Sequence, residues 1–335
     1  NLTEFLWRRG PDATNHLNYR GISFVHTLLS MTGKLTIQPF IDGEKDLVAF
    51  FNGEIYNYLE FGDYESDGQC ILPLYESLGP DFISLLDGEY TLAVFDFSKD
   101  LMIISTDIFS TKPLWFAIDN GEFALGSYVS SLHRHGFQNA EQIPANTTRL
   151  YTISTLELIE ERTVWDFDLT QHKTTFEDWN IAFENAIRKR TSGIKHGIFI
   201  GLSSGYDSGA IACELARQNV PFTAYSIVGS ENPDTIQQRF SMLENTEYIE
   251  LTRERFLNAR NHLKAYCEEY TLRIDNGEQD QYDRLAVEYH EVCAILDELE
   301  PIYRELNDPE VTDRVRINRN NKALLEKRMV RVQET

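Results

Sequence analysis

Short apolar runs dominate roughly the first 165 residues of the chain. The clearest lie at residues 46–56, 89–107 and 113–127, and the segments FNG, SKD and DNG supply turn signals within this region. Runs of this length and spacing are typical of β-strands. The segment FAIDNGEFALG predicts a hairpin around Asp119-Asn120-Gly121. The pattern therefore predicts stacked antiparallel sheets.

The periodicity changes near residues 166–175. Residues 174–193 carry apolar side chains at helical spacing after a TxxE-like start, which predicts a helix. The elements expected next are a strand at 197–202, a Ser/Gly-rich loop, a helix at 209–219, and strands at 222–229 and 246–252. Because a β–loop–α–β order is typical of a parallel sheet, this region is expected to form a second domain.

Beyond about residue 254 the pattern is mostly helical. Residues 286–306 place an apolar stripe on one face and charges on the other, as on a solvated helix, and Pro301 is expected to end or kink it. The final stretch, 314–335, is locally basic. We interpret it as a solvated helix, with a docking tail as the alternative.

Charge and composition narrow the classes of function. The net charge of −22 argues against duplex DNA or an anionic membrane as the main partner. No apolar run approaches the roughly 20 residues that span a bilayer. The four cysteines are widely spaced and form no CxxC pair. This usage argues against a zinc site and against a disulfide framework. It favours a reducing, cytoplasmic compartment.

The segment SSGYDSG (203–209) follows the strand expected at 197–202. A helix N-terminus presents unpaired N–H groups and a partial positive charge, so it attracts phosphate. Gly205 allows close approach of the backbone, whereas Asp207 would repel a bare phosphate and is expected to hold Mg²⁺ against a polyphosphate. The serines can add hydroxyl donors: Ser203, Ser204 and Ser208. The alternative is a serine-rich turn that only caps a helix.

This loop resembles the SGGxDS pyrophosphate loop of the N-type ATP pyrophosphatases, which adenylate a carboxyl or carbonyl oxygen. Upstream segments resemble, in order, the motifs of the class II glutamine amidotransferase domain: RRGPD (8–12), FNGEIYNY (51–58), SDGQCILPLYESLGP (66–80), LLDGEYTLAVFD (85–96) and TDIFSTKPLW (106–115). This layout is that of glutamine-hydrolysing asparagine synthetase. The resemblance covers roughly residues 5–255.

The resemblance implies an α+β fold followed by an α/β fold. Residues 1–168 are expected to form an Ntn-type four-layer sandwich of antiparallel sheets. Residues 169–275 would form the parallel-sheet ATP pyrophosphatase domain, and residues 276–335 a helical C-terminal region. The family's chemistry implies ATP and Mg²⁺, with glutamine and a carboxylate acceptor as substrates. Such synthetases are often dimers, which makes a homodimer a candidate assembly for this chain.

The resemblance also assigns roles in the first domain. In the family, the thiolate of an N-terminal cysteine attacks glutamine, and hydrogen-bond donors stabilise the resulting oxyanion. By resemblance, the Asn52 side chain and the Gly53 N–H form this oxyanion hole. Glu54 and Asp67 would hold the α-amino group of glutamine. The alternative for NGEIYN is a hairpin turn at the Asn-Gly pair.

In the second domain the resemblance carries the ATP site onto the loop. Its members would be Ser203, Ser204, Gly205, Asp207 and Ser208, with Asp207 as the metal ligand. Val228 would lie beside the adenine, and a buried strand residue is the alternative for it.

Several positions depart from the family pattern. The sequence begins at Asn1 instead of cysteine, so either residues are missing or the glutaminase has no nucleophile. Leu28 stands where an arginine clamps the glutamine carboxylate, and a leucine cannot pair with a carboxylate. Ser204 replaces the first glycine of SGGxDS, Thr106 and Ser110 replace an arginine and a glycine, and the SGEGSDE loop is not found.

Three functions compete on these observations. The first is an ATP-dependent amide synthetase that takes ammonia from glutamine. The second is an ATP-dependent amide or ring-closing synthetase with an inactive glutaminase domain, which Leu28 favours. The third is a non-catalytic relative that acts as a binding or assembly module, which the missing SGEGSDE loop favours.

Overall fold

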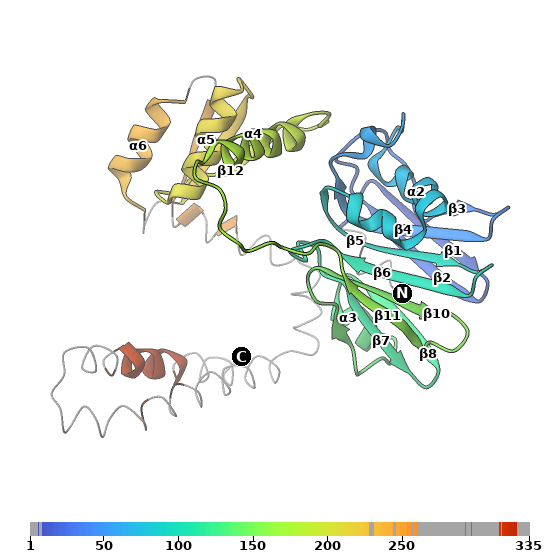
Figure 1. Cartoon of the computed structure of the whole chain (residues 1–335). Coiled ribbons are helices and arrows are strands. Elements are labelled where there is room, and N and C mark those ends of the chain that lie inside the picture. Colours follow the sequence, from blue (N-terminus) through green and yellow to red (C-terminus); the bar gives the residue numbers. More distant parts are fainter. Residues whose placement is uncertain are drawn as a thin grey trace. The chain divides into compact units, whose positions relative to one another are not determined.

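The computed structural model describes residues 6, 9–227, 231–243, 246–252, 254–255, 258–259, 292, 296, 315 and 317–326. It divides into two compact units, Asn1–Leu263 and Lys264–Thr335. Every strand in the described part of the chain belongs to the first unit (Figure 1). None of the helices in the described part of the chain combines the length and hydrophobicity of a bilayer-spanning segment.

A six-stranded antiparallel sheet forms the centre of the amino-terminal half (Figure 1). Its strand order is β11-β10-β6-β5-β4-β3. The strands are β3 (Phe40–Asp42), β4 (Leu47–Ile55), β5 (Gly88–Asp96), β6 (Leu101–Thr106), β10 (Thr147–Thr152) and β11 (Leu158–Thr163). Strands β4 and β5 pair along their whole length, from Leu47 opposite Asp96 to Ile55 opposite Gly88.

Alternate residues of the central strands feed two separate cores, because successive side chains of a strand point to opposite faces. Leu47, Ala49 and Phe51 of β4 pack with helix α2 (Ile71–Leu78). Three short 3₁₀ helices lie nearby in the sequence: Tyr58–Glu60, Asp67–Cys70 and Gly79–Leu85. The intervening Val48 belongs to the second core, which Phe24 of β2 and Phe116 of β7 complete.

Smaller antiparallel sheets supply that second layer. One is the hairpin of β1 (Ala13–Tyr19) and β2 (Ile22–Leu28). The other has the order β8-β7-β9 and consists of β7 (Trp115–Asp119), β8 (Glu122–Gly126) and β9 (Glu141–Gln142), with α3 (Val129–Arg134) against β7 and β8. The predicted stacked antiparallel sheets and the hairpin at Asn120-Gly121 are confirmed; both turn residues have positive φ, 51° and 80°.

The next segment of the first unit contains a three-stranded parallel sheet of order β12-β13-β14. The elements follow as α4 (Glu177–Thr191), β12 (Ile198–Gly201), α5 (Tyr206–Arg217), β13 (Phe222–Ile227), α6 (Pro233–Ser241) and β14 (Thr246–Leu251). The predicted parallel sheet is therefore confirmed. Helix α6 was not predicted. It begins where Asn232 accepts a hydrogen bond from the Thr235 N–H at 3.1 Å, with Pro233 in its first turn.

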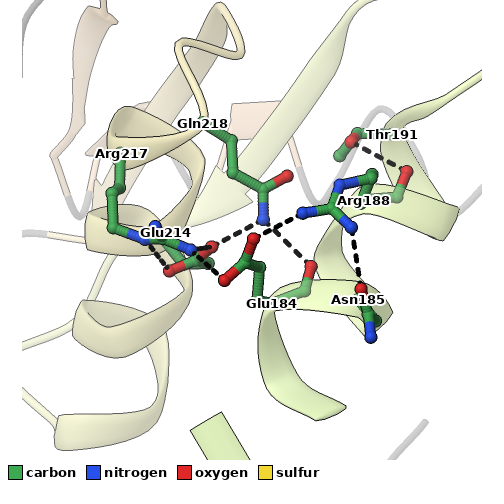
Figure 2. Close-up of polar contacts among 7 residues, drawn as sticks. All are labelled: Glu184, Asn185, Arg188, Thr191, Glu214, Arg217 and Gln218. Atoms are coloured by element: carbon green, nitrogen blue, oxygen red, sulfur yellow. Dashed lines mark hydrogen bonds and ion pairs between the residues drawn. The ribbon is translucent and has the colours of Figure 1, made fainter. Parts of the chain in front are cut away.

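A charged network joins α4 to α5 (Figure 2). Arg217 bonds Glu214 through Nε and Nη2, both at 2.8 Å, and Nη2 also lies 2.7 Å from Glu184 of α4. Gln218 Nε2 donates to the main-chain carbonyl of Glu184 at 2.9 Å. The open cleft of about 470 Å³ beside this network is lined by Glu184, Arg217 and Gln218 of the network and also by Arg188, Thr191, Ser192 and Val220. Because Arg217 pairs with Glu214 of its own helix and with Glu184 of α4, the network connects the two helices.

The structure describes only some of the residues beyond 254, so it tests only some of the predictions for the C-terminal region. Residues 317–326 are helical, as expected for the final stretch. The helix predicted over 286–306 lies outside the described residues except for Val292 and Leu296, and Val228 also lies outside them. The domain boundaries after residues 168 and 275 stay predictions.

Candidate active site

The NGE segment lies inside strand β4, where Asn52 faces Thr91, Gly53 faces Tyr90 and Glu54 faces Glu89 of β5. The alternative of a hairpin turn at Asn52-Gly53 is therefore wrong. The structure also shows why position 53 holds glycine. Its φ is +150°, and a Cβ there would lie 1.9 Å from the main-chain oxygen of Glu89.

The Asn52 side-chain amide is a buried hydrogen-bond donor. No hydrogen-bond partner for its Nδ2 occurs among the residues that the structure describes. Leaving a buried donor unpaired is unfavourable, so such groups are uncommon in folded proteins. The Asn52 Nδ2 group, beside the strand residue Gly53, could therefore donate a hydrogen bond to an oxygen atom of a ligand.

Asp67 lies beneath the end of β4. It is 5% exposed and begins the 3₁₀ helix before α2. Its carboxylate accepts hydrogen bonds from the main-chain N–H groups of Ile55 and Gly68, both at 2.9 Å, and from the Ser66 hydroxyl at 3.3 Å. Burial nevertheless raises the pKa of Asp67, because desolvation outweighs these bonds.

Glu54 shares this acidic environment. Burial raises the pKa of Glu54 to about 7, and the charge of Asp67 adds to the rise. The Thr32 hydroxyl and the Lys112 ammonium act in the opposite direction. A buried carboxyl and a half-buried one that repel each other would be stabilised by a cation between them. The structure therefore brings Asn52, Gly53, Glu54 and Asp67 together as predicted, although their roles stay predictions.

His26 of β2 was not predicted. Burial lowers its pKa to about 4, so the imidazole is neutral at pH 7. Its pKa also responds to a hydrogen bond with the backbone of Phe51, which places it beside β4. No local pattern in VHTLLSM distinguished this histidine from a surface one, because its neighbour comes from another strand.

Leu28 ends β2 and is fixed by the GPD segment. Its main-chain oxygen accepts a hydrogen bond from the Asp12 N–H at 3.0 Å. Gly10 lies so close that a Cβ there would stand 2.2 Å from the carbonyl carbon of Thr27. Arg9 stacks over the Tyr128 ring, 4.9 Å from its centroid.

The TDIFSTKPLW segment forms a turn beside β5. Asp107 is 3% exposed and accepts hydrogen bonds from the main-chain N–H groups of Tyr90, Phe109 and Thr111 at 2.8–3.0 Å. Lys112 Nζ then lies 3.7 Å from Glu89. The conformation of this turn therefore places a cation near the acidic pair.

The described cysteines do not supply a thiolate to this strand. Cys70 is buried, and burial raises the pKa of its thiol to about 12. Cys213 is exposed on α5, in the parallel-sheet region. A thiol nucleophile at β4 would have to come from another residue.

The Ser/Gly loop lies between β12 and α5. The Ser203 N–H donates to Ser208 Oγ at 3.0 Å, the Gly205 N–H to Ser203 Oγ at 3.1 Å, and the Ser204 N–H to Glu231 Oε2 at 2.5 Å. Each of these three N–H groups thus has an acceptor within the chain, and sequence reasoning missed Glu231.

Asp207 is exposed in the first turn of α5. Within the described residues, no three His, Cys, Asp or Glu side chains are grouped closely enough to hold a metal ion. One carboxylate together with phosphate oxygens is an ordinary Mg²⁺ environment, so Asp207 fits the role expected of it. That role stays a prediction.

The amino-terminal half of the chain matches a known family of domains. Residues 1–166 match the family model described as a glutamine amidotransferase domain. The chain is 28% identical over 244 residues to "Putative asparagine synthetase [glutamine-hydrolyzing] 1" of Methanocaldococcus jannaschii, covering 64% of this chain and 44% of that protein. It is 27% identical over 224 residues to "Asparagine synthetase B [glutamine-hydrolyzing]" of Escherichia coli, covering 63% and 40%.

A solved glutamine phosphoribosylpyrophosphate amidotransferase from B. subtilis matches 60% of this chain and 50% of its own, with a TM-score of 0.36 and 14% identity. A similarity at this level carries no functional inference. The chain spans less than half the length of the two asparagine synthetase relatives. The amidotransferase match and the alignments that run on past it together show that the chain is a divergent member of the glutamine-hydrolysing asparagine synthetase family.

Proposed function

We propose that this chain acts in ATP-dependent amide synthesis of the asparagine synthetase type, with ammonia taken from glutamine and transferred to an adenylated carboxylate. The proposal includes the finer fold assignment, an Ntn-type four-layer sandwich followed by an ATP pyrophosphatase domain. The observation that carries it is the unpaired Asn52 amide beside the Glu54–Asp67 pair.

Glutamine fits the chemistry at β4. Its α-ammonium group would lie against Glu54 and Asp67, where it would offset their mutual repulsion and favour ionised Glu54. Its side-chain oxygen would accept from Asn52 Nδ2 and from the Gly53 N–H. Both donors are fixed by the β4–β5 pairing, so they require little reorganisation as negative charge develops on that oxygen.

The ATP half of the reaction is assigned to the 203–208 loop and α5. The loop would bind the polyphosphate, and Asp207 would hold Mg²⁺ against it. An acceptor carboxylate would attack the α-phosphorus and release pyrophosphate, and ammonia would then displace AMP. Such chemistry depends mostly on positioning and charge neutralisation.

A second candidate keeps the ATP chemistry and has an inactive glutaminase. Leu28 favours it, because the position where the family places a carboxylate-binding arginine offers no charge. In this case ammonia or another amine would support amide formation, and glutamine would not.

Three assays on the full chain separate these functions. ATP–pyrophosphate exchange is expected in the wild type and lost in Asp207→Asn, whose melting temperature should match the wild type. Asn52→Ala should lower glutamine-dependent glutamate release by about 10²–10³-fold and leave the exchange unchanged.

Each alternative predicts a different result. Exchange without glutamate release identifies the inactive-glutaminase synthetase. Equal exchange in Asp207→Asn and the wild type would remove the metal-binding assignment. If no variant catalyses ATP–pyrophosphate exchange, the remaining function is that of a non-catalytic binding or assembly module.

A further inference from the structure

The acceptor of the Ser204 N–H comes from far along the chain. Ser203 and Ser208 satisfy the other two N–H groups locally. Glu231, 27 residues downstream, accepts from the Ser204 N–H at 2.5 Å and from the Ser204 hydroxyl through the same oxygen. A carboxylate oxygen that accepts from a main-chain N–H and a hydroxyl just before a helix makes the contacts that a phosphate oxygen would make.

The opposite side of the loop is held by a cation. Arg239 Nη1 donates to the main-chain oxygens of Ser203 at 2.5 Å and Gly205 at 2.6 Å. In a trans peptide the C=O of one residue and the N–H of the next point in opposite directions. Arg239 therefore directs the N–H groups of Ser204 and Tyr206 away from itself.

Gly209 of α5 makes room for this contact. A Cβ at that position would lie 2.8 Å from the Arg239 guanidinium carbon. The hydrogen bonds from Ser204 and the charge of Arg239 also lower the pKa of Glu231, which keeps the carboxylate ionised at neutral pH. Loop, cation and carboxylate thus form one connected arrangement.

We propose that Arg239 is the positioning residue of this loop and that Glu231 is an internal substitute for the phosphate, which the nucleotide must displace. The proposal rests on the proposed function, because it assumes that nucleotide binds at 203–208. Ser204 distinguishes this chain from the usual family pattern, which has glycine at that position. Its hydroxyl donates the second hydrogen bond to Glu231.

The test is calorimetric titration of the full chain with the α,β-methylene analogue of ATP and excess Mg²⁺. Glu231→Gln should bind about tenfold more tightly than the wild type, because the competing charged acceptor is gone. Arg239→Gln should bind about tenfold more weakly, and Arg239→Lys should recover part of the loss because an ammonium can still donate to both carbonyls.

Glu247→Gln is the matched control for charge. It removes one exposed carboxylate near the start of β14, at the opposite end of the parallel sheet from the loop, and should leave the affinity unchanged. Melting temperatures of all variants report on folding. A structural role alone would not move Glu231→Gln and Arg239→Gln in opposite directions.

The outcomes separate this proposal from the proposed function. Opposite shifts support the proposal, as does binding seen only after Glu231→Gln. If the wild type binds and Glu231→Gln binds equally or more weakly, the proposal is overturned while the ATP assignment stands. If no variant binds, Glu231→Gln included, both are overturned.

Discussion

Asp67 and Ile55 are joined by a hydrogen bond of 2.9 Å in which the main-chain N–H at the end of β4 donates to a buried carboxylate. This bond fixes the 3₁₀ helix that carries Asp67 to the strand that carries Asn52, Gly53 and Glu54. The acidic pair is therefore held by a bond between a main-chain N–H and the buried side chain of Asp67. A substitution that replaces one atom of the Asp67 carboxylate can therefore test this contact.

Asp67→Asn should destabilise the protein by about 1–3 kcal/mol, because an amide nitrogen replaces one of two oxygens that accept buried N–H groups. The variant should also lower the pKa of Glu54, since a repelling charge is removed. Urea denaturation measures the first effect and NMR titration of Glu54 the second. Glu65→Gln, an exposed neighbour, should stay within about 0.5 kcal/mol of the wild type. An unaltered pKa of Glu54 would show that burial alone sets it.

His26 and Glu54 should give opposite pH dependence to stability. The pKa of His26 is about 4 folded and 6.5 unfolded, so the unfolded state binds more protons between these values and stability rises with pH. The pKa of Glu54 is about 7 folded and 4.5 unfolded, so stability falls as pH rises through that window. Between pH 4.5 and 6.5 the two effects oppose each other.

Glu54→Gln should therefore reveal the His26 slope, up to about 1.4 kcal/mol per pH unit. His26→Gln should reveal the opposite slope from Glu54. The measurement is the free energy of unfolding in urea at pH 4.5, 5.5, 6.5 and 7.5. Parallel curves for the wild type and Glu54→Gln would contradict the raised pKa of Glu54.

Local patterns predicted much of this fold. The hairpin at Asn120-Gly121 and the parallel sheet β12–β14 follow from turn chemistry and from the change of hydrophobic period, both of which are visible within a few residues. The Asn52-Gly53 pair shows the limit of such patterns. It matches a turn locally, yet the pairing with Thr91 and Tyr90 keeps it in a strand.

Contacts between distant residues could not be read from the sequence. The Ser204–Glu231 bond joins residues 27 apart, and the raised pKa of Glu54 depends on burial and on Asp67. The resemblance to a family indicated the residues at β4, but only the fold shows that the Asn52 amide has no hydrogen-bond partner among the described residues. Sequence thus located candidate groups, and tertiary packing set their partners and protonation.

Cys70 and Cys213 should differ sharply in reactivity. Iodoacetamide should modify Cys213 in the native protein at pH 8, because that thiol is exposed. Cys70 should stay unmodified until the protein unfolds, because it is buried and its pKa is about 12. Peptide mass spectrometry with and without urea measures both sites, and the Cys213→Ser variant identifies the exposed signal. Native labelling of Cys70 at the rate of Cys213 would refute the burial of that thiol.

Gly53→Ala should be among the most damaging small substitutions in the amino-terminal half. A Cβ would lie 1.9 Å from the Glu89 main-chain oxygen, and a φ of +150° is strained for alanine. Relief requires β4 and β5 to separate, so we expect a loss of about 3 kcal/mol or more in the free energy of unfolding. Gly43→Ala is the matched control, because a Cβ there meets nothing within 4 Å. Urea denaturation compares the two variants, and a Gly53→Ala protein as stable as Gly43→Ala would show that β5 does not approach β4 this closely.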